Sequence, residues 1–99
     1  MTQVMMMQEG NQLTAFLSGE IDHHWAAVMR EQIDETLKAT TPQKLILDFS
    51  GVTFMDSSGV GLILGRYRLM NSWKGTVVVQ KAPASIKRML AIAGIESKD

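Results

Sequence analysis

The chain of 99 residues contains no cysteine. This excludes disulfide scaffolds, thiolate zinc sites and cysteine nucleophiles, and it fits a reducing compartment, so a cytoplasmic protein is expected. Charge of one sign is not in excess either, because ten Lys and Arg residues balance ten Asp and Glu residues. Binding to nucleic acid or to a membrane surface usually relies on a basic excess, so neither partner is expected.

Long apolar runs and linker-like segments are also absent. The apolar runs fall far short of the ~20 residues that a membrane-spanning helix needs, and with only two prolines no Pro-, Gly- or Ser-rich stretch is long enough to be a linker. The N-terminus has no basic segment followed by an apolar stretch, so no secretion signal is expected. With 45% hydrophobic residues, the chain can bury one core, and a single domain over residues 1–99 is expected.

Hydrophobic periodicity predicts strands that alternate with helices. The predicted elements are strands at 2–8 and 12–18, a helix at 23–39, a strand at 44–49, a helix from Ser57 or Ser58 to Met70, a strand at 76–80 and a helix from Pro83 to Gly94. The order β-β-α-β-α-β-α predicts an α/β fold, with a mainly parallel sheet, an N-terminal hairpin and helices packed against the sheet. The second helix is expected to bury Val60, Ile63, Leu64 and Tyr67.

The densest group of candidate functional residues is Asp56-Ser57-Ser58, between a buried strand and a helix. In one interpretation a side-chain oxygen of this group caps the helix by accepting a hydrogen bond from its first turn. In the other, a serine hydroxyl is exposed at the helix N-terminus, where free N–H groups and the helix dipole tolerate an added phosphate. The residues alone leave both interpretations open.

The glycines that follow do not form a nucleotide site. In Gly59-x-Gly61-x-x-x-Gly65 one residue too many separates the second and third glycines for a dinucleotide fingerprint, and the chain has no phosphate-loop motif. No cofactor is therefore expected. The glycines are better explained by a close approach of the helix to the sheet or to a partner.

Two histidines and two acidic residues cluster near the start of the first predicted helix. Adjacent residues on a helix point ~100° apart, so His23 and His24 are poorly placed to share one metal ion, and no metal site is expected. Glu20 and Asp22 either cap this helix or contact a partner. No G-x-S-x-G motif surrounds Ser57, so neither a hydrolase triad nor any other enzyme activity is expected.

Three segments together resemble a known family. Residues 54–67, with 17–24 and 82–94, resemble the anti-sigma factor antagonists of the sulphate-transporter and anti-sigma antagonist (STAS) domain family. The closest likeness is to the anti-sigma F factor antagonists of spore-forming bacteria. It spans roughly Gln3 to Ile95, and Asp-Ser-Ser-Gly is its most specific part.

The resemblance implies a switch protein in transcription regulation. The unphosphorylated form is expected to bind an anti-sigma factor that is also a serine kinase, and so to release a sigma factor. The kinase is expected to phosphorylate Ser57, which switches the protein off, and a phosphoserine phosphatase resets it. The partner-binding residues implied in this way are Glu20, Asp22, Asp56, Ser58, Gly59, Gly61 and Arg66.

Two other functions stay open: a histidine phosphocarrier that uses His23 or His24, and a regulatory STAS domain unrelated to sigma factors. Family members usually continue past the equivalent of Gly94 with a further strand and a closing helix, whereas this sequence ends at Asp99. The resemblance thus implies that both elements are missing. An uncovered sheet edge would favour self-association, and a homodimer is one expected assembly.

Overall fold

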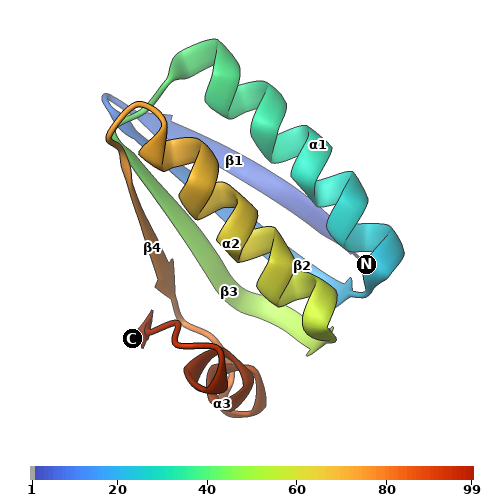
Figure 1. Cartoon of the computed structure of the whole chain (residues 1–99). Coiled ribbons are helices and arrows are strands. Elements are labelled where there is room, and N and C mark those ends of the chain that lie inside the picture. Colours follow the sequence, from blue (N-terminus) through green and yellow to red (C-terminus); the bar gives the residue numbers. More distant parts are fainter. Residues whose placement is uncertain (1) are drawn as a thin grey trace.

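The computed structural model describes residues 2–99, which form one sheet and three helices (Figure 1). The elements are β1 (Gln3–Glu9), β2 (Gln12–Ile21), α1 (His23–Thr40), β3 (Lys44–Met55), α2 (Ser57–Asn71), β4 (Thr76–Gln80), α3 (Ala84–Ile92) and β5 (Ser97–Lys98). The predicted order of the first seven elements is confirmed. The short strand β5 was not predicted, because two residues are too few to show a periodicity. Its pairing with β4 corrects the expectation that no further strand follows Gly94.

The sheet has the strand order β1-β2-β3-β4-β5 and is mainly parallel, as predicted. Strands β1 and β2 form the antiparallel N-terminal hairpin, with Gly10 at a positive φ of 58° in its turn. The other neighbouring strands run parallel, since each is joined to the next by a crossover helix. The carboxyl ends of β2 and β3 therefore lie together at one edge of the sheet.

Helices α1 and α2 lie side by side over one face of the sheet, while α3 lies apart from them, beyond the end of β4 (Figure 1). The core between α1, α2 and the sheet contains Met29, Ile33 and Leu37 of α1, with Leu45 and Leu47 of β3. On the opposite face, Met5 and Met7 of β1 and Phe16 of β2 are exposed.

The buried face of α2 agrees with the predicted one in part, since Ile63 is buried and Val60 and Tyr67 pack against the core. Helix α2 buries Gly59, Leu62, Ile63, Arg66 and Met70, whereas Leu64 is 46% exposed. Apolar residues are spread around this helix, so their spacing alone did not reveal which side faces the sheet.

The third helix lies within the predicted range 83–94. Pro83 precedes it, Ile86 and Leu90 are buried, and Gly94 has a φ of 80° just after its end. Within residues 2–99, no helix is both long and apolar enough to cross a membrane.

Candidate phosphorylation and docking site

Helices α1 and α2 begin side by side at the carboxyl edge of the sheet. Ile21, the last residue of β2, pairs with Met55, the last residue of β3. The backbone N–H of Asp56 then donates to the carbonyl of Ile21 at 3.2 Å. Because one residue separates each strand from its helix, the first turns of both helices and the residues before them occupy the same edge.

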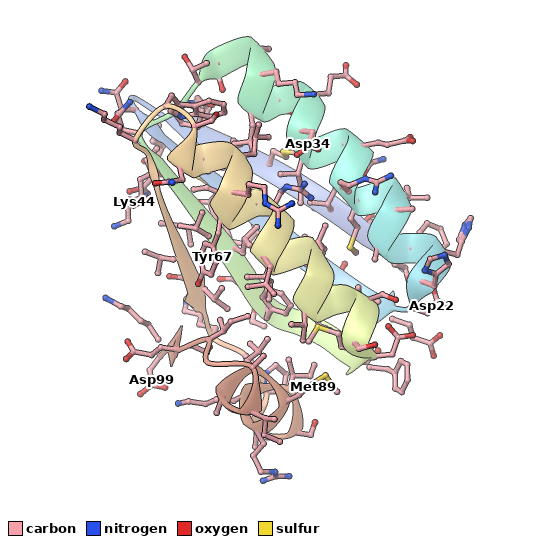
Figure 2. The ribbon with its side chains drawn as sticks, in the orientation of Figure 1. Asp22, Asp34, Lys44, Tyr67, Met89 and Asp99 are labelled. Atoms are coloured by element: carbon pink, nitrogen blue, oxygen red, sulfur yellow. The ribbon has the colours of Figure 1, made fainter. Side chains whose placement is uncertain are left out.

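Asp22 and Asp56 cap the two helices in the same way. The Oδ1 atom of Asp22 accepts a hydrogen bond from the backbone N–H of Trp25 at 2.9 Å, and Oδ1 of Asp56 accepts one from Ser58 at 2.8 Å. Both aspartates have extended backbone angles, as N-cap residues do. Figure 2 shows Asp22 at the beginning of α1. Both aspartates therefore cap the helices that follow them.

Ser57 is left free because Asp56 supplies the cap. Ser57 is the first residue of α2 and is exposed. Its hydroxyl makes no hydrogen bond to any residue between 2 and 99. Ser58 is half-buried, and its backbone N–H is taken by Asp56. Of the two serines, Ser57 has the accessible hydroxyl, at a helix end whose dipole favours negative charge.

The remaining polar residues of this edge are exposed. Glu20 lies at the end of β2, where its backbone N–H donates to the hydroxyl of Thr2 at 3.0 Å and its carboxylate faces solvent. His23 and His24 are both exposed, and the ring of His24 meets that of Trp25 edge-on with centroids 5.0 Å apart. In the part of the chain that the structure describes, no three His, Asp or Glu residues are grouped to hold a metal ion.

The three glycines of α2 occupy different environments. Gly59 is buried, and a Cβ at this position would overlap the sulfur and Cγ of Met55. Gly59 is thus needed for the close approach of α2 to the end of β3. A Cβ at Gly61 or Gly65 would meet nothing within 4 Å. Packing within the chain therefore explains Gly59 and does not explain Gly61 or Gly65.

Arg66 lies inside the domain, between α1 and α2. Its side chain is 6% exposed, and its Nε atom is 2.9 Å from Oδ1 of Asp34. Figure 2 shows Asp34 on the part of α1 that faces α2. Burial lowers the pKa of the Arg66 guanidinium, Asp34 raises it and the nearby charge of Arg30 lowers it further, so that the net shift is downward.

Gly59 and Arg66, two of the expected partner-binding residues, are buried. Within the domain, Gly59 packs on Met55 and Arg66 pairs with Asp34. Asp34 was missed from the sequence, where it is one of several charged residues on the polar side of α1. Its only signal was that α1 and α2 would lie next to each other on one face of the sheet.

A groove of about 370 Å³ runs between the N-terminal halves of α1 and α2. This α1–α2 groove begins at the two helix starts, where His23 and Ser58 line it. Farther along, its walls are formed by Arg30 of α1 and by Gly61, Gly65 and Arg66 of α2. Three residues that the sequence singled out, Ser58, Gly61 and Arg66, thus share one surface depression beside Ser57.

Comparisons with known proteins agree with this architecture. The model of the STAS domain family matches residues 3–98. The anti-sigma F factor antagonist of Paenibacillus polymyxa is 37% identical over 93 residues, which cover 94% of this chain and 80% of that protein. The anti-sigma F factor antagonist of Lysinibacillus sphaericus is 33% identical over 79 residues, covering 80% of this chain and 68% of that protein.

Solved structures have the same fold. The unphosphorylated form of the anti-sigma factor antagonist SpoIIAA matches with a TM-score of 0.85 and 24% identity, over 98% of this chain and 89% of that one. The phosphorylated form of the Bacillus cell fate determinant SpoIIAA matches with a TM-score of 0.77 and 26% identity, over 100% and 92% of the two chains. Sequence and fold together show that the chain belongs to the STAS domain family.

Proposed function

We propose that this protein is an anti-sigma factor antagonist that is switched by phosphorylation of Ser57. In its unphosphorylated form it binds an anti-sigma factor and so releases a sigma factor. The observation that carries the proposal is the free, exposed hydroxyl of Ser57 at the start of α2, beside an aspartate that already caps the helix. The relatives named anti-sigma F factor antagonist support the assignment of the partner.

The docking surface of the proposal is the edge where α1 and α2 begin. Ser57 and Glu20 are exposed there, and the half-buried Asp22 and Asp56 add acidic groups. These carboxylates suit basic side chains on the partner. Gly61 continues the surface along α2, where the absence of a side chain lets a partner approach the helix backbone closely.

The switch acts by repulsion at this surface, with the fold preserved. A phosphate at Ser57 adds about −1.5 to −2 charges, which the free N–H groups and dipole of the α2 N-terminus tolerate. A kinase site that holds nucleotide phosphates and acidic groups does not tolerate them. Two charges against one at ~6 Å, with an effective dielectric of ~40, repel by roughly 3 kcal/mol. Affinity for the anti-sigma factor then falls about a hundredfold or more.

The anti-sigma factor of this proposal is itself the ATP-dependent serine kinase. The proposal includes two further partners. One is a phosphoserine phosphatase, which restores the active form in the cytoplasm, and the other is a second copy of the chain. Among residues 2–99, β1 pairs with β2 alone and β5 covers only the last two residues of β4, so both sheet edges offer unpaired backbone groups. In sedimentation experiments the fraction of dimer should increase with protein concentration. A monomer at all concentrations would contradict the homodimer.

The protein itself is proposed to have no turnover. Its Ser57 is a substrate of the kinase, and the two exposed histidines are not hydrogen-bonded to it. Purified protein should not hydrolyse ATP or GTP. Hydrolysis that disappears on a point substitution in this chain would contradict this part of the proposal.

Phosphorylation by the cognate kinase tests the site assignment. With ATP, one phosphate should be added to the wild-type protein and to Ser58→Ala, and none to Ser57→Ala. Ser58→Ala is a matched control because Ser58 is the adjacent residue. The helix cap is kept in this variant, since Asp56 accepts its hydrogen bond from the backbone N–H of residue 58 and not from the side chain. Phosphate incorporated into Ser57→Ala would contradict the assignment.

A histidine phosphocarrier is the second candidate, because His23 and His24 are exposed at the same edge. Acid treatment separates the two, since phosphoserine survives acid and phosphohistidine does not. A pull-down from the native cytosol, followed by mass spectrometry, distinguishes both from a regulatory STAS domain unrelated to sigma factors. The proposed function requires an anti-sigma factor among the captured proteins.

A further inference from the structure

The guanidinium of Arg66 has more hydrogen-bond donors than the chain satisfies. Its contact with Asp34 joins Nε to Oδ1 at 2.9 Å, but neither this pair nor Nη1 of Arg66 has a well-aligned hydrogen bond within residues 2–99. Arginine carries five N–H donors, and burying donors without acceptors is costly. Buried polar groups in native proteins almost always have a partner. Arg66 therefore calls for an acceptor from outside the chain.

The charges around Arg66 favour an acceptor with negative charge over a water molecule. Arg66 and Arg30 both line the α1–α2 groove, and Arg30 is close enough to lower the pKa of Arg66. Asp34 neutralises one of the two arginines, which leaves one positive charge in the groove. His23 and Ser58 also line the groove, and an imidazole and a hydroxyl are groups that can donate hydrogen bonds.

The groove is also open to a ligand beside these donors. Gly61 and Gly65 line it on the α2 side, and a Cβ built at either position would meet nothing within 4 Å. Both glycines lie inside a helix, where glycine costs stability relative to alanine. No contact within residues 2–99 accounts for that cost, whereas a ligand that approaches the helix backbone would.

We propose that the α1–α2 groove is an oxyanion-binding site, in which Arg66 and Arg30 hold a carboxylate or phosphate group. Arg66 provides the buried, preorganised donors, and the exposed Arg30 closes over the anion from α1. The group can belong to a free anion or to an acidic side chain of the docked anti-sigma factor. Binding of a free anion does not depend on the proposed function.

Arginine side-chain NMR tests the site on the isolated protein. The Nε–Hε signals are followed during titration with inorganic phosphate, with sodium chloride adjusted to keep the ionic strength constant. The Arg66 signal should shift saturably, with a dissociation constant of roughly 1–10 mM. In Arg30→Gln, which changes an exposed residue and leaves the buried ion pair intact, this constant should rise about tenfold. Arg88→Gln is the matched control, because Arg88 is exposed on α3 and does not line the groove.

A second arm identifies the source of the anion. The affinities of Arg30→Gln and Arg88→Gln for the anti-sigma factor are measured by calorimetry. A loss confined to Arg30→Gln assigns the groove to an acidic side chain of the partner, and equal affinities assign it to a free anion. The proposal is overturned if the Arg66 signal does not respond saturably to phosphate, or if Arg30→Gln binds phosphate as well as the wild type.

Discussion

Replacing Gly61 by alanine should make the domain more stable and its complex weaker. Gly61 lies inside α2, and a Cβ there would meet no atom within 4 Å, so the substitution causes no overlap. Alanine favours the helix over glycine by about 0.8–1 kcal/mol. For a domain of this size, such a gain raises Tm by about 4–8 °C. If a partner approaches the helix backbone at this point, the added methyl group should also lower its affinity, by about tenfold.

Gly59→Ala is the matched control, because the same change two residues earlier meets a different environment. Its Cβ would overlap the buried side chain of Met55, and overpacking of this kind costs about 1–3 kcal/mol. Urea denaturation should therefore rank stability as Gly61→Ala, wild type, Gly59→Ala. Calorimetry with the anti-sigma factor supplies the second readout. A destabilised Gly61→Ala would refute the packing argument, and unchanged affinity would refute the placement of the docking surface.

Three further substitutions test other parts of the structure by chemical denaturation. Asp56→Ala removes the cap of α2 and should cost about 1 kcal/mol, and no loss would contradict the capping role. Asp34→Ala leaves the buried guanidinium of Arg66 without its carboxylate and should lower the free energy of unfolding by about 2–3 kcal/mol, a value reduced because Asp34 is partly exposed. A loss below about 0.5 kcal/mol would contradict a coupled ion pair. Burial raises the pKa of Asp48, but two side-chain hydrogen bonds, a backbone hydrogen bond and a nearby lysine outweigh it and lower the pKa below its ordinary 3.8. The stability that Asp48 contributes is therefore present above about pH 4 and lost as the pH falls below it. Asp48→Asn should lose less stability on acidification than the wild type. An identical dependence of stability on pH in the two proteins would contradict this.

The order of the elements could be predicted because their periodicities are distinct. Apolar residues recur every four positions in α1, and the apolar run of β3 is nearly continuous, so the sequence separates helix from strand. The buried face of α2 could not be predicted in the same way. Leu64 is as apolar as Leu62, and which of them faces the sheet depends on how the helix rests on β3.

The candidate site was predicted in part for a similar reason. The position of Ser57 at a helix start follows from local sequence, and so does the capping ability of the neighbouring aspartate. The partnership of Arg66 with Asp34 joins residues on two different helices. No local pattern reveals such a pair, because it depends on the distance and rotation between the helices.

The most direct test of the Ser57 switch is the affinity for the anti-sigma factor before and after phosphorylation, measured by calorimetry, with NMR spectra of the free protein in both states. Affinity should fall about a hundredfold or more. Chemical shift changes should be confined to the neighbourhood of Ser57, because the helix N-terminus tolerates the phosphate. Ser57→Asp should weaken binding less, since it adds only one charge. Unchanged affinity, or shift changes that spread through β4 and α3, would contradict a local switch at Ser57.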